Sequence, residues 1–171
     1  MAYLLSAAGP RAHRRLVFRF GGIMIEGIFH CNVNCSDLER SIGFYEMLGF
    51  QVVLDFRSGM RSAEMAKAFG MADADLRGVH LRLGDDPRAT RIDLVEFTRP
   101  KTAGSSYASL NHTGVVRLCL RTTDIQRVYE DLVAKGVPFL SAPQTLPGTN
   151  VTIACFHDPD GVTLELLEGS F

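Results

Sequence analysis

Two stretches of the chain repeat one pattern of hydrophobic and polar positions. Each opens with an alternating, strand-like run, one starting at His30 and the other at Arg117, and each run leads into apolar residues at helical spacing. An aspartate stands at the same place in both stretches, Asp37 and Asp124. The run starts are 87 residues apart, and so are the aspartates. We therefore interpret the chain as a tandem repeat of one structural unit.

The helical segment of each repeat has a predicted start, a buried face and a predicted end. Ser36 with Glu39, and Thr123 with Gln126, fit the capping box that opens a helix. The positions expected to be buried are Leu38, Ile42, Tyr45 and Leu48 in the first helix, and Ile125, Val128, Leu132 and Val133 in the second. Each helix should end at a glycine, Gly49 or Gly136, before another strand at 50–54 or 137–140.

The repeats close on matching strands at 92–96 and 164–168. These strands are 72 residues apart, against 87 for the starts of the repeats, so the first repeat contains about fifteen extra residues. These residues lie near 57–78, where 62–69 predicts a short extra helix. The pattern predicts an α+β fold in which two tandem βαβββ modules form cupped mixed β-sheets around a shared cleft, with helices outside. The predicted parts are an N-terminal extension at 1–25, a first module at 26–99 with the helical insertion, a linker at 100–112 and a second module at 113–171.

Alternation along the strands places polar side chains on the face that turns away from the helices. A half-exposed sheet would also show polar residues there. These rows, however, recur at matched positions of the repeat and are rich in residue types that bind metals and oxyanions. They contain His30, Asn32, Asn34, His80, Arg82 and Asp93 in the first module, and Arg117, Arg121 and Glu165 in the second. We predict that they wall a small-molecule site.

Composition narrows the class of protein. A net charge of −1 argues against a nucleic-acid partner. The sequence contains no run of about 18 apolar residues, so no membrane span is predicted. The four cysteines lie in apolar, strand-like runs and are expected to be buried, reduced thiols of a cytoplasmic protein. The first 25 residues are rich in Arg and resemble an organellar transit peptide, but we favour a non-conserved or mis-started extension with Met24 as a possible true start.

The motifs resemble those of the vicinal oxygen chelate superfamily. The resemblance covers roughly residues 26–169 and is carried by His30, the segments 37–41, 44–45 and 48–50, the turn 158–161 and Glu165. That superfamily includes glyoxalase I, methylmalonyl-CoA epimerase, extradiol dioxygenases and bleomycin- and fosfomycin-resistance proteins. The resemblance implies paired modules, a small-molecule substrate or ligand and commonly a homodimer.

Metal-dependent members of the superfamily take their ligands from the first and last strand of each module. Carried over by position, the ligands would be His30, Asp93, Arg117 and Glu165. Arg117 cannot ligate a metal, because a guanidinium offers no lone pair near neutral pH. The resemblance therefore leaves two interpretations of the site open.

In the first interpretation His30, Asp93 and Glu165 hold a divalent ion, either Zn, Ni, Mn, Mg or Fe, and Glu165 or His80 acts as the catalytic base. The chain would then be a glyoxalase-like lyase or isomerase acting on a carbonyl- or carboxylate-bearing substrate. The expected substrate contacts are Asn32, Asn34, Arg82, Tyr107, Arg117 and Arg121. A ring-cleaving, dioxygenase-like enzyme is a second possibility for the same metal site.

In the second interpretation Arg117 pairs with Asp93, Glu165 or both, and its charge replaces that of the ion. The cleft would then bind a ligand by shape, stacking and hydrogen bonds. The chain would be a metal-free binding or resistance protein of the same fold.

Overall fold

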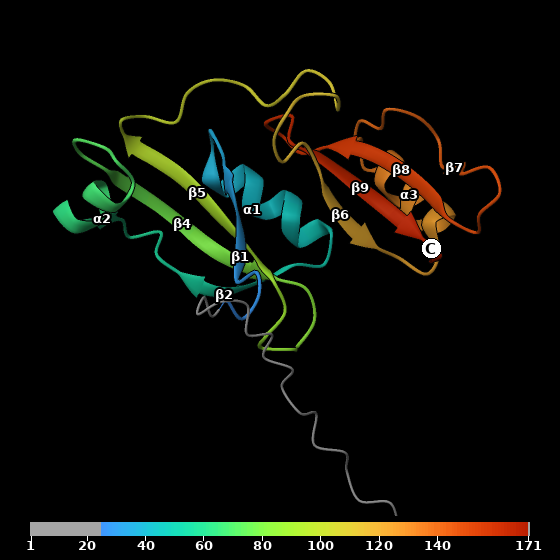
Figure 1. The fold of residues 1–171 in the computed structure, drawn as a ribbon, viewed down its shortest axis with the longest axis horizontal. Helices are drawn as coiled ribbons and strands as arrows, with labels where there is room; N and C mark the ends of the chain where they lie inside the picture. Colours follow the sequence, from blue (N-terminus) through green and yellow to red (C-terminus); the bar gives the residue numbers. More distant parts are fainter. Residues whose placement is uncertain (1–24, 171) are drawn as a thin grey trace, which may run out of the picture.

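The computed structural model describes residues 25–170, which form two mixed β-sheets side by side (Figure 1). The first sheet contains β1 (His30–Asn34), β2 (Gln51–Asp55), β3 (Met60–Arg61), β4 (Asp75–Arg82) and β5 (Arg91–Arg99). The second contains β6 (Leu118–Arg121), β7 (Gln144–Thr145), β8 (Thr152–His157) and β9 (Thr163–Glu168). Three helices complete the fold, α1 (Leu38–Met47), α2 (Ala63–Ala68) and α3 (Ile125–Ala134).

Both sheets have the same topology. The strand order is β1-β5-β4-β2 in the first, with β3 also on β4, and β6-β9-β8-β7 in the second. In each sheet the first strand lies parallel to the last, and the last lies antiparallel to the one before it. This equivalence confirms the predicted α+β class and the repeat. We call β1–β5 with α1 and α2 the first module, and β6–β9 with α3 the second; the exact boundaries drawn from the sequence stay a prediction.

The helix starts differ by one residue from the predicted caps. Asp37 and Asp124 are the N-caps, and their side chains accept hydrogen bonds from the amides of Arg40 and Arg127, each at 3.1 Å. The capping boxes expected at Ser36 and Thr123 are therefore wrong, because each helix begins one residue later and its aspartate cap accepts from the amide three residues further on. Ser36, which does not cap the helix, instead contacts Asp160 of the other module.

The predicted helix ends are confirmed, whereas one expected core residue and the strand expected after α3 are not. Gly49 and Gly136 have φ of 93° and 83°, which confirms both left-handed caps. Val133 is 46% exposed and does not join the core, contrary to expectation. The strand expected at 137–140 is reduced to an isolated bridge at Phe139, since Pro138 has no amide to donate to a ladder.

The two modules share one hydrophobic core, in which residues of α1, α3 and both sheets pack together. Tyr45 of α1 is fully buried, and its hydroxyl donates to Asp158 Oδ2 in the β8–β9 turn at 3.2 Å. Burial and the Asp158 charge raise the pKa of Tyr45, so the phenol keeps the donated proton. Asp160 of the same turn accepts from the Ser36 amide at 3.0 Å and from Arg40 at 2.8 Å. The predicted turn at 158–161 thus joins the modules.

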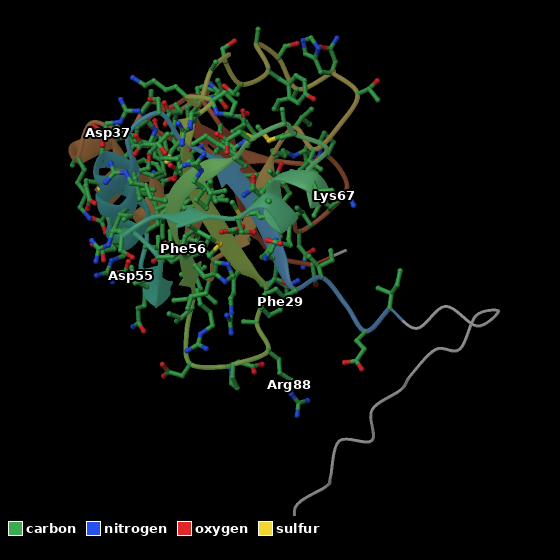
Figure 2. The ribbon with its side chains drawn as sticks, turned by 90° about the vertical axis from the view of Figure 1, so that its left-hand side faces the viewer. Phe29, Asp37, Asp55, Phe56, Lys67 and Arg88 are labelled. Atoms are coloured by element: carbon green, nitrogen blue, oxygen red, sulfur yellow. The ribbon has the colours of Figure 1, made fainter. Side chains whose placement is uncertain are left out.

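The insertion of the first module forms the expected helix. Ser62 caps α2 by accepting from the amide of Met65, and the helix lies at the end of the first module that is farthest from the second (Figure 1). In Figure 2, Lys67 projects outward from α2 and Arg88 projects from the loop between β4 and β5.

Three further expectations concern the chain outside the sheets and its thiols. The 1–25 extension lies outside the described residues except for its last position. The four cysteines are free, but only Cys35 is buried and Cys119 is exposed, so the expectation of four buried thiols is wrong. Among the described helices, none is long and apolar enough to span a membrane.

Candidate functional site

The polar face of the first module is ordered by strand register. Asn32 of β1 and His80 of β4 both lie opposite Asp93 of β5, one on each side. Residues that face each other across neighbouring strands point to the same side of a sheet. His30 stands two positions before Asn32 and therefore shares this face. The register thus brings an amide, two imidazoles and a carboxylate together.

These side chains are close enough to act as one group. His80 Nε2 lies 3.4 Å from Asp93 Oδ1, and His30 Nε2 lies 3.8 Å from Asp93 Oδ2. One potential ligand atom from each of the three residues lies within 4.8 Å of the others. Asn32 Nδ2 donates to Asp93 Oδ2 at 3.3 Å and orients the carboxylate. We refer to His30, His80 and Asp93 as the first-module triad.

The triad has unused bonding capacity. Asp93 Oδ1 and His80 Nδ1 are buried atoms without a hydrogen-bond partner among the described residues. A buried polar atom left unpaired costs about 1–3 kcal/mol, so each one calls for an explanation such as a water, an ion or a catalytic role. Burial lowers the pKa of His80 more than the charge of Asp93 raises it, which keeps the imidazole neutral with a lone pair available. Two imidazoles and a carboxylate fit a divalent transition metal.

A cavity of about 530 Å³ opens beside the triad. Its polar lining residues are His30, Asn32, Asn34, His80 and Asp93. Its apolar lining residues are Leu54, Phe56, Met60, Met65, Phe69, Met71, Leu76, Val95 and Phe97. Five residues of the predicted polar face therefore share one cavity, and the insertion supplies much of its apolar wall.

The matched face of the second module has a different chemistry. Arg117 Nε lies 2.6 Å from Glu165 Oε2, and the Glu165 side chain is only 7% exposed. Cys119 and Cys155 flank Glu165 on the neighbouring strands, in the positions that Asn32 and His80 hold around Asp93. Burial, followed by the Glu165 carboxylate, raises the pKa of Cys119 to about 11, and burial likewise raises that of Cys155. This face carries a closed ion pair between two protonated thiols.

The structure does not bring every predicted site residue to one place. Glu165 belongs neither to the first-module triad nor to the residues that line its cavity. Arg82 donates to the carbonyl of Gly84 at 3.1 Å, and Arg121 lines a separate cavity of about 310 Å³ near α1 and α3. Tyr107 stacks on His112 with ring centroids 5.2 Å apart.

A second cavity of about 420 Å³ lies between the linker and the two modules. Tyr107 lines it, together with residues of β1, the start of β6 and the β8–β9 turn. His30, Asn32 and Asn34 line both this cavity and the larger one. The first strand therefore forms the partition between the two spaces.

Sequence comparison places the chain in a family. The sequence profile of the Glyoxalase/Bleomycin resistance protein/Dioxygenase superfamily matches residues 27–166. The chain belongs to this superfamily. It is also 29% identical over 155 residues to YwkD, an uncharacterised protein of Bacillus subtilis, and the match covers 85% of this chain and 99% of the relative.

Solved structures of this superfamily share the fold. A glyoxalase family protein from Bacillus cereus superposes with a TM-score of 0.77 at 15% identity, over 88% of this chain and 98% of that protein. A superfamily member from Sphaerobacter thermophilus has a TM-score of 0.60 at 25% identity, covering 86% and 100%. The trypanothione-dependent glyoxalase I of Leishmania major has a TM-score of 0.56 at 24% identity, covering 83% and 86%. At these identities the likeness supports the fold and leaves the reaction open.

The apolar wall is what sequence reasoning missed. The insertion was expected to form a helix, but its side chains were not assigned to the site. A signal was present, because Met60, Met65 and Met71 are three of the six methionines of the chain and fall within one short segment. Methionine-rich segments are common at adaptable binding surfaces.

Proposed function

We propose that the chain is a glyoxalase-type lyase or isomerase that acts on a small carbonyl- or carboxylate-bearing molecule in the first-module cavity. His30, His80 and Asp93 would hold a divalent metal. The observation that carries the proposal is the unpaired Asp93 Oδ1, buried 3.4 Å from a desolvated, neutral His80.

The donor set fits a metal, and the chain's own residues fit the accompanying proton chemistry. A bound divalent metal would polarise a substrate carbonyl or enol oxygen. Asn32 holds the Asp93 carboxylate in place. Phe29 and Phe56 lie edge-on to His80, with ring centroids 6.0 and 5.9 Å away, and keep water from its ring. With the metal held by His30 and Asp93 alone, a neutral His80 would be free to accept a proton from the carbon beside the substrate carbonyl.

The composition of the triad also favours a second candidate function. Two histidines and one carboxylate form the donor set of non-haem Fe(II) oxygenases as well as of catalytic zinc sites. A ring-cleaving dioxygenase would use the same three residues and the same apolar cavity. The identity of the metal distinguishes the two activities.

The Arg117–Glu165 pair favours the metal-free alternative. It occupies half of the ligand set that the superfamily resemblance implies, and at 2.6 Å it satisfies Glu165 without an ion. If the first-module triad behaves in the same way, the chain is a metal-free binding protein whose cavity takes a ligand by shape and apolar contact. A homodimer is expected under each alternative, and its mass in solution can be measured by light scattering.

Elemental analysis of the protein purified without chelator separates these functions. We expect one zinc, nickel, manganese or iron ion per chain, lost in Asp93→Ala and retained in Glu165→Gln. Substoichiometric metal, with no thermal shift on adding any of these ions or magnesium, would leave the metal-free binder as the function.

Activity is then tested with the metal-loaded protein. Exchange of the protons beside the carbonyl of 2-oxo acids in D₂O, followed by NMR, is expected for a lyase or isomerase and should be lost in His80→Ala and Asp93→Ala. Oxygen uptake with catechols and an iron content of one per chain, without such exchange, would instead establish the dioxygenase.

A further inference from the structure

The insertion of the first module builds an apolar wall that the second module lacks. Met60 of β3, Met65 and Phe69 around α2, and Met71 all line the 530 Å³ cavity. In the second module, among the described residues, no helix lies between β7 and β8. Phe69 is 54% exposed and Met60 is 44% exposed, although large apolar side chains normally avoid water. Their grouping around one cavity forms an exposed apolar patch of the kind found at binding sites.

The cavity changes character along one direction. On β4 and β5, His80 lies opposite Asp93, Gly78 opposite Val95, and Leu76 opposite Phe97. Met60 lies opposite Leu76, and Phe69 packs on Phe97 with ring centroids 6.5 Å apart. His80 and Leu76 are four residues apart on the strand, which is about 13 Å at 3.3 Å per residue. The site is thus polar at the triad and becomes apolar over about the length of a small organic molecule.

Gly78 shapes the middle of this path. A Cβ at this position would lie 2.7 Å from the ring of Phe56 and would also collide with the Leu94 carbonyl. The amide of Phe56 donates to the Gly78 carbonyl at 3.0 Å, which holds the ring over the strand beside His80. Because residue 78 has no side chain, Phe56 forms part of the cavity wall between the polar and apolar ends.

We infer that the site selects amphipathic small molecules, with an oxygen-bearing head at the first-module triad and an extended alkyl or aromatic body along the Met60–Met65–Phe69 wall. The inference rests on the proposed function for the position of the head. Methionine side chains are flexible and polarizable, so the wall discriminates by apolar surface more than by exact shape. Lengthening the body by one methylene should therefore tighten binding about fourfold until the cavity is filled.

The test measures how affinity depends on ligand length. Dissociation constants are determined by calorimetry or NMR for straight-chain 2-oxo acids from pyruvate to 2-oxooctanoate, and for phenylpyruvate. A parallel series of straight-chain primary alcohols, which cannot chelate, reports on the wall alone. Met65→Gln places a polar group of similar size in the wall. Ala68→Gln, an exposed position of the same helix that does not line the cavity, is the matched control.

We expect both series to tighten about fourfold per methylene in the parent protein and in Ala68→Gln, and Met65→Gln to flatten this dependence. His80→Ala should weaken the 2-oxo acids at every length and leave the dependence on length unchanged. A flat dependence in the parent protein, with one metal ion still bound, would overturn this inference and leave the proposed function intact. No metal but a retained dependence would overturn the proposed function alone. If the affinity of the parent protein does not depend on ligand length, and Met65→Gln converts a dimer into a monomer, the inference is overturned. A second copy of the chain would then cover the wall.

Discussion

Two faces at matched positions of the repeat contain different chemistry. In the first module Asp93 lies between Asn32 and His80, with His30 nearby and two buried polar atoms unpaired. In the second module Glu165 lies between Cys119 and Cys155, and Arg117 closes on it at 2.6 Å.

The difference shows that matched positions of one fold can serve different purposes, ligand binding in one module and a stabilising ion pair in the other. A carboxylate that keeps a free lone pair beside imidazoles can accept a cation or a substrate proton. A nearly buried carboxylate with a guanidinium partner is neutralised within the chain and has little capacity left for a ligand. The repeat therefore contains one face with unpaired polar atoms and one face whose carboxylate is neutralised by an internal ion pair.

Converting the second face into a copy of the first is expected to have the largest effect. Arg117→His with Cys155→His places two imidazoles around Glu165, in the positions that His30 and His80 hold around Asp93. The double variant should gain a second divalent-metal site, with affinity raised about 100-fold over the parent face, since even the outer-shell partners of a metal site contribute 10–100-fold. Calorimetric titration with zinc gives the number of sites. Unchanged stoichiometry would mean that the backbone of the two faces is not equivalent.

Removing the closing charge should cost the next largest amount. Arg117→Met leaves the nearly buried Glu165 without its charged partner, with only the Cys155 thiol donating to it at 3.9 Å. It should lower the free energy of unfolding by about 2–3 kcal/mol, below the 3–5 of a fully buried pair because the Arg117 side chain is 43% exposed. The matched change His30→Met removes no closed pair and should cost less than about 1 kcal/mol. Urea unfolding measures both, and equal losses would contradict the contrast drawn between the faces.

Filling the gap at Gly78 tests the wall of the first face. By register the equivalent residue in the second module is Ile153, which lies opposite Leu167 as Gly78 lies opposite Val95. Gly78→Ala should destabilise the protein by about 1–2 kcal/mol, as overpacking does, and displace Phe56 from His80. Gly43→Ala is the control, because a Cβ there meets nothing within 4 Å and Ala favours its helix. No loss of thermal stability in Gly78→Ala would show that both the Leu94 carbonyl and the Phe56 ring can shift at little cost.

The thiols of the second face provide the smallest and most local test. The pKa of Cys119 is raised to about 11, so the folded protein holds this thiol protonated at neutral pH, and alkylation should accelerate as the pH rises toward that value. Glu165→Gln removes the second cause of the shift, after burial, and should increase the iodoacetamide rate several-fold near pH 8. Mass spectrometry of the Cys119 peptide gives the rate. An unchanged rate would assign the whole shift to burial.

Much of the fold was predictable because it depends on local pattern. The repeat, both glycine caps, the insertion helix and the β8–β9 turn follow from periodicity and turn chemistry within short windows. The caps moved by one residue because Ser36 and Asp37 are both favourable N-cap residues, and only a small energetic difference decides which of the two starts the helix. The strand expected at 137–140 is reduced to one bridge because Pro138 has no amide to donate to a ladder.

The sequence predicted which residues belong to the polar faces better than it predicted which of them lie close together. Alternation placed His30, Asn32, Asn34, His80 and Asp93 on one face, and the structure gathers all five at one cavity. The superfamily resemblance placed Glu165 with His30 and Asp93 in the first interpretation and beside Arg117 in the second, and the structure pairs it with Arg117. Side-chain alternation specifies which way a residue points on its own sheet, and it carries no information on how two sheets are placed relative to each other.

By itself, the sequence determined that the two modules are alike in fold and unlike at positions 30 and 117, because strand alternation, helix caps and the chemistry of an arginine are properties of short segments. Only the tertiary structure decided that His80 joins His30 and Asp93, that Arg117 closes on Glu165, and that three methionines of the insertion line the cavity. Those outcomes depend on strand register and on the packing of segments that lie far apart in the chain, which bring groups within a few ångströms that no local pattern connects.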